Sequence, residues 1–375
     1  MAEPLPYPHP RFDPARRPLP FTAWPVADRT AWTAAITVGD VLEAGGAAAG
    51  WRPATRRNVV QVWGHYLAWL AATGQLEAGE RLPQRITPER LAGFVAALQA
   101  RGNGARTLHM RVEALGLFLR VAVPDADRQP VRQLLRRLRV AMEAEASARR
   151  LRKRARLQSS HDLLALGLEL MAKAEAGPLS ARRRAVLHRD GLIIALLAAR
   201  PLRRRNFVAL ELGRHLLRIG ESWRLVIPGA ETKTGRPLEL PFPPVLLPAL
   251  ERHLAVHRPC LAAGRGLGQG HAGAALWLSA EGGPLSGTML GAMVKARTRA
   301  AFGRSVNLHL FRDAAATSVA LEDPASVRIA AQVLGHGNFA TTERHYNLAQ
   351  GEKAAESWHQ VLDRRRRQGS RKGST

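Results

Sequence analysis

The stretch NLHLFRDAAATSVAL, residues 307–321, places a histidine and an arginine three positions apart. If a helix opens here, His309 and Arg312 share one face, because residues three apart lie on the same side of an α-helix. Together they offer hydrogen-bond donors to one anion, while Asp313 points elsewhere. Taken alone the signal is weak, since this spacing arises by chance in any arginine-rich chain.

A second stretch, LGHGNFATTERHYNLA, covers residues 334–349. Gly335 and Gly337 flank His336, so the backbone there can approach a ligand closely. Tyr346 is one of three tyrosines in the chain. A phenol has a pKa of about 10, and nearby cations lower it. A tyrosine gathered with arginine and histidine can therefore attack phosphorus as a nucleophile.

The charge balance points to a polyanionic partner. The 375 residues include 56 Lys and Arg against 30 Asp and Glu, a net charge of +26. Lysine or arginine set against phosphate releases condensed counterions, which makes nucleic acid the expected partner. A GC-rich genome that favours arginine codons explains part of the excess. Hydrophobic residues make up 46% and aromatic residues 5% of the chain, a balance that favours helices.

Several classes of protein are not expected. Cys260 is the only cysteine, which excludes an intrachain disulfide and a cysteine-based zinc site. The start of the chain is rich in proline and does not resemble a signal peptide. The longest apolar run, residues 191–199, is shorter than the roughly 20 residues that span a bilayer. We expect a cytoplasmic protein, at the bacterial nucleoid, with no membrane partner.

The chain divides by composition into an arm, a helical domain, a linker, a second domain and a tail. Prolines at eight positions up to 25 predict an extended arm over residues 1–33. Apolar residues at helical spacing predict a bundle over 34–147. The basic run at 148–160 is interpreted as a linker, or as the solvated end of the preceding helix. The second domain is expected over 161–366, followed by a polar tail over 367–375.

The second domain combines helices with a small sheet. The segments HLLRIG, WRLVIP and PLELPFP, within residues 215–243, are short, rich in β-formers and separated by turns. They predict a three-stranded antiparallel sheet at the edge of a helical body. The fold is therefore expected to be mainly α.

The two stretches quoted above resemble the C-terminal signature of the tyrosine recombinases, the phage-integrase family. That resemblance directs attention to two further segments. The first arginine of the family's set matches Arg203 in ARPLRRRNFVAL, residues 199–210, and its lysine matches Lys233 in TKTGRPLELP, residues 232–241. Two departures stand out: Asn206 occupies the place of a usual glutamate, and Tyr346 lies one residue late, with His345 in the usual slot.

The resemblance implies a fold and a mechanism. A helical core-binding, SAM-like domain would precede an α-rich catalytic domain, and the two would act on double-stranded DNA. Six residues would form the active site: Arg203, Lys233, His309, Arg312, His336 and the nucleophile Tyr346. The product would be a 3′-phosphotyrosyl link, formed without ATP, metal or another cofactor. Recombination of two sites implies a homotetramer on two duplexes, with a final helix around Trp358 docking on its own chain or on a neighbour.

Some alternatives stay open. Arg204 is the second choice for the first catalytic arginine, since residues 203–205 are all arginine. A DNA-binding architectural protein could keep the fold and lack cleavage. A metal-dependent nuclease fits less well, because no His-x-His pair or paired carboxylates accompany the histidines.

Overall fold

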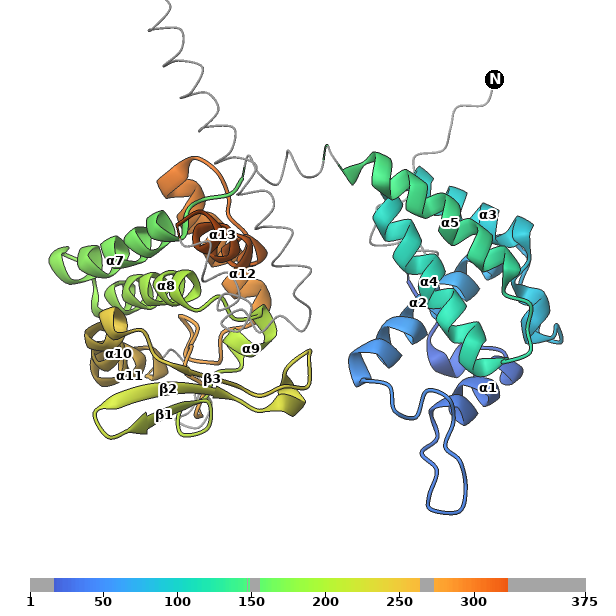
Figure 1. The fold of residues 1–375 in the computed structure, drawn as a ribbon, viewed down its shortest axis with the longest axis horizontal. Helices are drawn as coiled ribbons and strands as arrows, with labels where there is room; N and C mark the ends of the chain where they lie inside the picture. Colours follow the sequence, from blue (N-terminus) through green and yellow to red (C-terminus); the bar gives the residue numbers. More distant parts are fainter. Residues whose placement is uncertain (1–16, 147, 149–155, 264–272, 323–375) are drawn as a thin grey trace, which may run out of the picture. The chain divides into compact units, whose positions relative to one another are not determined.

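The structure is a computed structural model that describes residues 17–146, 148, 156–263 and 273–322. The chain forms two compact units, Met1–Leu151 and Arg152–Thr375, which Figure 1 draws in blue to green and in green to red. The boundary between them falls inside the basic run that the sequence marks as a linker.

The first unit is a helical bundle whose aromatic side chains form its core. In chain order its elements are η2 (Phe21–Ala23), α1 (Val26–Ile36), α2 (Pro53–Ala72), η3 (Leu82–Arg85), α3 (Pro88–Ala100), α4 (Ala105–Ala122) and α5 (Gln129–Ala144). Phe118 of α4 stacks on Trp63 of α2, with ring centroids 3.9 Å apart, and on Trp32 of α1, at 5.6 Å. Helices α4 and α5 lie side by side along the bundle (Figure 1).

The N-terminal segment corrects the predicted arm of residues 1–33. Helix α1 begins at Val26, and Trp24 and Trp32 are each only 3% exposed within the core. Leu19 joins this packing, since its backbone N–H donates to Gly64 O at 2.9 Å. Pro25 immediately precedes the helix, a place where the missing N–H of proline costs nothing. The prolines near residue 25 therefore mark where a helix starts, and the extended-arm prediction is wrong over this part.

The second unit is built around α8 (Ala181–Ala199), which α7 (Ser160–Ala176) crosses closely. Two glycines allow that approach: a Cβ added to Gly191 would lie 2.6 Å from Gly167 O. The remaining helices are α9 (Arg204–Val208), α10 (Leu247–Arg252), α11 (Arg258–Ala262), α12 (Gly287–Phe302) and α13 (Leu308–Glu322), with short turns η4 (Gly229–Glu231), η5 (Pro244–Leu246) and the π-helical turn η6 (His253–His257). Ser159 begins α7, because its side chain accepts a hydrogen bond from the N–H of Asp162 at 3.0 Å.

The predicted three-stranded antiparallel sheet is present. Strands β1 (Leu216–Ile219), β2 (Ser222–Ile227) and β3 (Leu238–Pro241) pair in the order β1-β2-β3. Leu225 in the central strand faces Leu216 on one side and Leu240 on the other. The sheet lies below α9 in the view of Figure 1. These elements confirm the mainly α fold with one small sheet.

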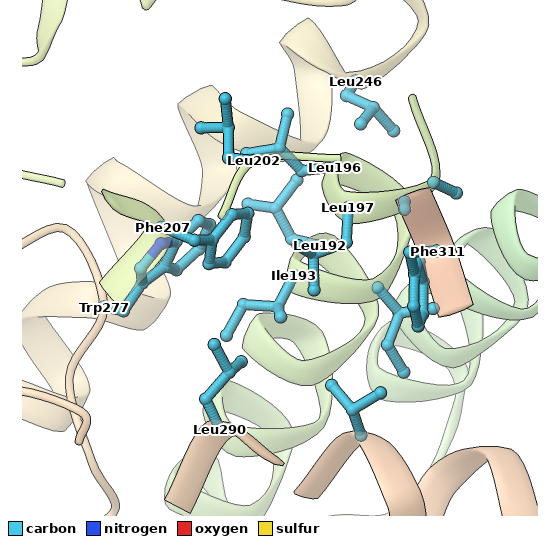
Figure 2. Packing of buried hydrophobic residues seen from close by; sticks show 14 of the residues in the cluster. Leu192, Ile193, Leu196, Leu197, Leu202, Phe207, Leu246, Trp277, Leu290 and Phe311 are labelled. Atoms are coloured by element: carbon cyan, nitrogen blue, oxygen red, sulfur yellow. The ribbon is translucent and has the colours of Figure 1, made fainter. Parts of the chain in front are cut away.

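The core of this unit lies on both sides of α8. Figure 2 shows Leu192, Ile193, Leu196 and Leu197 of α8 between Phe207 and Trp277 on one side and Phe311 on the other. The Phe207 and Trp277 rings stack at 5.3 Å. Because Phe311 is buried next to Arg312, packing of the core fixes where that arginine lies.

Candidate active site

The segment that carries Arg203 joins α8 to α9. Leu202 is buried and anchors it, and Arg200 donates from Nε to Pro241 O of β3 at 3.3 Å. Arg203 is the residue immediately before α9, with extended backbone dihedrals, and its side chain is half-buried. Burial lowers the pKa of Arg203 below its ordinary value.

His309 and Arg312 lie on the first turns of α13, as their spacing predicts. Asn307 caps this helix, because its Oδ1 accepts from the backbone N–H groups of His309 at 3.0 Å and Leu310 at 3.2 Å. The two predicted site side chains differ in environment: His309 is exposed, whereas Arg312 is only 9% exposed. Arg312 is buried because its neighbour Phe311 belongs to the core.

Arg312 reaches back to the segment after α8. Its Nη1 donates to Pro201 O at 2.5 Å, so residues more than a hundred positions apart meet here. Burial, and after it the positive charge of Arg203, lowers the pKa of Arg312 to about 10, while Asp313 acts in the opposite direction. Two guanidinium groups are thus close enough to repel, and one of them is desolvated. Such an arrangement favours a bound anion and suits a phosphate diester, whose oxygens match the planar guanidinium.

Lys233 lies in the connection between β2 and β3. Gly235 adopts φ +77 and a Cβ on Gly229 would lie 2.4 Å from Gly235 O, so glycine is required at both positions of this tight turn. Thr232 is buried and donates from Oγ1 to Arg236 O at 2.8 Å, which orders the turn. The Lys233 side chain is exposed at its tip.

Two predicted site residues, His336 and Tyr346, lie outside the described residues, and so do His345 and Trp358. The structure therefore brings together Arg203 and Arg312, places His309 three positions before Arg312 on α13, and places Lys233 on a separate turn. The runner-up Arg204 has an exposed side chain that faces α12.

A basic groove along α12 was not found by sequence reasoning. It encloses about 450 Å³ and is lined by Arg204, Lys295, Arg299 and Ser305 together with small residues of α12. The signal available in the sequence was the pattern of glycine and alanine with a basic residue on one helical face, as in GTMLGAMVKARTRAAF, residues 287–302. Small side chains leave room at the helix surface, and the cations supply positive charge beside the exposed Arg204.

A second cluster of polar side chains was also not predicted from the sequence. Glu175, His188 and His257 bring one ligand-type atom each within 4.8 Å of one another. They come from α7, α8 and η6, and are 13 and 69 positions apart in the chain. No short sequence motif can predict this cluster, because only the packing of the three elements brings its residues together.

None of the described helices combines the length and the apolar character that crossing a bilayer requires.

Comparisons with known proteins find similarity in structure alone. The sequence matches no protein-family model, and no curated protein matches it. Among solved structures, the site-specific recombinase XerH bound to palindromic difH substrate, a post-cleavage complex, is 15% identical, with a TM-score of 0.53 over 81% of this chain and 80% of that one. XerH bound to difH substrate in a pre-cleavage complex is 16% identical, with a TM-score of 0.51 over 81% and 79% of the two chains. The chain therefore has the fold of the site-specific recombinase XerH.

Proposed function

We propose that the protein is a tyrosine-type site-specific recombinase that cuts and rejoins double-stranded DNA. The observation that carries the proposal is the pair of guanidinium groups at Arg203 and Arg312, one buried and both close together, on a fold shared with XerH. In phosphoryl transfer, negative charge spreads over the non-bridging oxygens, so fixed cations supply most of the stabilisation.

Each site residue has a proposed role. Arg203 and Arg312 bind the non-bridging oxygens of the scissile phosphate, while His309 and His336 donate hydrogen bonds to it. Tyr346 attacks phosphorus, and its phenolic proton passes to one of the histidines. The bond to the 5′ oxygen breaks, and Lys233 gives that oxygen a proton as general acid. The 3′-phosphotyrosyl link conserves the energy of the phosphodiester, so the reaction needs neither ATP nor a metal ion.

Affinity for DNA is assigned to the first unit as well. Helix α5 presents exposed Arg132, Arg136, Arg137 and Arg139, while Val131 and Leu138 on its other face are buried. An arginine-rich helix face of this kind suits contact with the phosphate backbone. We assign core DNA binding to residues 34–147 and strand cleavage to 161–366. The linker 148–160 connects the two, and four protomers act on two duplexes in the bacterial cytoplasm.

A covalent-trapping experiment tests the proposal. Tag-free protein is first used to select binding sites from a pool of random duplexes. Selected duplexes with a nick that lets the cleaved fragment diffuse away are then incubated with protein in EDTA and run on a denaturing gel. We expect a covalent protein–DNA band that is absent in Tyr346→Phe and retained in the matched control Tyr7→Phe.

Other outcomes separate the competing functions. A gel shift without a covalent band would favour a DNA-binding architectural protein. Cleavage that appears only after Mg²⁺ is added would favour a metal-dependent nuclease. A covalent band that persists in Tyr346→Phe would assign the nucleophile to another residue.

A further inference from the structure

A cluster of titratable side chains lies apart from the candidate active site. Glu175 is on α7, His188 on α8 and His257 on η6. His188 on α8 is twelve positions before Arg200, the residue that follows the end of this helix, about 18 Å along the axis. The proposed strand-cleavage chemistry uses none of these residues. We propose that Glu175, His188 and His257 bind one Zn²⁺ ion that ties the three elements together.

The carboxylate oxygen of Glu175 lies from each histidine nitrogen at nearly the spacing that zinc requires. Glu175 Oε1 lies 2.9 Å from His257 Nε2 and 3.3 Å from His188 Nδ1. Ligands at about 2.0–2.1 Å from a tetrahedral zinc ion are about 3.3 Å apart. The three donor atoms all lie within 4.8 Å of one another, so a zinc ion can enter once the two stacked histidine rings move apart. Two histidines and one carboxylate fill three positions and leave the fourth for water.

Hydrogen bonding orients His188 as a ligand. Its Nε2 is 3.1 Å from Ala249 O, and because a carbonyl oxygen can only accept, Nε2 carries the proton. The lone pair of the neutral ring is then at Nδ1, the atom that faces Glu175 Oε1. Nδ1 is buried and makes no hydrogen bond, despite the 3.3 Å separation from that oxygen. A backbone carbonyl that fixes the outer nitrogen is the usual support of a metal-bound histidine.

The residues around the site limit which metal ion can bind and how many ligand atoms Glu175 can offer it. The rings of His188 and His257 stack with centroids 4.0 Å apart, and both side chains are almost fully buried. Arg252 pairs with Oε2 of Glu175, which leaves Oε1 as the single carboxylate ligand atom. Two imidazole nitrogens and one carboxylate oxygen suit Zn²⁺ and disfavour Mg²⁺ or Ca²⁺, which prefer sites made of oxygen.

Metal titration of the full-length, tag-free protein tests the site. Zn²⁺ is titrated in competition with a coloured chelator, for the wild type and for Glu175→Gln. We expect Glu175→Gln to lose one equivalent of zinc, or to bind it at least about tenfold more weakly. Co²⁺ in place of Zn²⁺ should give the visible absorption of a tetrahedral site in the wild type, and Mg²⁺ should not compete.

Arg252→Gln is the matched control. It breaks the same ion pair as Glu175→Gln but keeps all three ligands, so we expect its zinc affinity to equal or exceed that of the wild type. Equal losses in the two variants would assign the effect to the broken ion pair and overturn the proposal. So would a wild type that binds no zinc, or a Glu175→Gln variant that binds as the wild type does.

Discussion

Replacing Arg312 by methionine should leave the second unit as stable as in the wild type, or slightly more stable. Burial, and after it the charge of Arg203, lowers the pKa of Arg312 from the ordinary arginine value to about 10. Its folded pKa lies below its unfolded value, so the unfolded chain binds this proton more tightly. The charge therefore costs stability at all pH values below about 10, and the cost is relieved as the pH rises from there toward the ordinary pKa of arginine.

The size of the effect follows from the same values. At about 1.4 kcal/mol for each pH unit, holding this cation in the fold costs about 3 kcal/mol. Methionine removes that cost but also removes the hydrogen bonds of Arg312, among them the one to Pro201 O at 2.5 Å, a loss of about 1–3 kcal/mol. The variant should therefore be between equally stable and about 2 kcal/mol more stable than the wild type. For a unit of this size, that corresponds to a rise in the unfolding midpoint of up to about 6 °C.

Differential scanning calorimetry at pH 7 measures the unfolding midpoint of Arg312→Met, with Arg189→Met as the control. Arg189 is also buried in the second unit, but it donates to Asp190 Oδ1 at 3.1 and 2.7 Å and to Leu278 O at 2.6 Å. Removing it takes away one of the two arginines that pair with the buried Asp190 carboxylate, leaving only Arg297 on Oδ2, and should cost about 1–3 kcal/mol. If Arg312→Met lowered the midpoint as much as Arg189→Met does, Arg312 would be a structural cation and the anion-site reasoning would be refuted.

Two further predictions concern packing and pH. Gly191→Ala should destabilise the second unit by about 1–3 kcal/mol in urea unfolding, because the new Cβ would lie 2.6 Å from Gly167 O. The control Gly291→Ala, whose new Cβ meets nothing within 4 Å, should not destabilise the unit in this way. Equal losses of stability in the two variants would contradict the close crossing of α7 and α8. Burial, and then the charge of Arg111, lowers the pKa of His65 to about 4, so the unfolded chain binds this proton more tightly between pH 6.5 and 4. The first unit should lose stability as the pH falls through that window, and His65→Gln should lose less when unfolding is followed across it; identical pH profiles would contradict this prediction.

Much of the second unit could be predicted from local sequence. The three strands were recognisable because each is a short run of β-formers bounded by turn residues, and Gly220 and Gly235 adopt the left-handed backbone that such turns need. The start of α13 and the shared face of His309 and Arg312 followed from helical spacing. These features depend on neighbours a few residues apart, which a sequence displays directly.

Features that depend on distant contacts could not be predicted. The prolines before residue 25 gave no sign that Trp24 packs into a core made by helices later in the chain. Burial of Arg312 depends on Phe311 meeting α8, and its hydrogen bond depends on Pro201. The Glu175, His188 and His257 cluster has no local pattern, because each residue comes from a different element.

The central claim is that Tyr346 becomes covalently joined to the 3′ end of a cleaved strand. Its most direct test is mass spectrometry of the peptide that retains nucleotide after the trapped complex is digested with protease and nuclease. The account predicts a phosphotyrosine-linked nucleotide on Tyr346 alone, formed in EDTA. An adduct on another residue such as His345, or cleaved DNA with no adducted peptide, would contradict it.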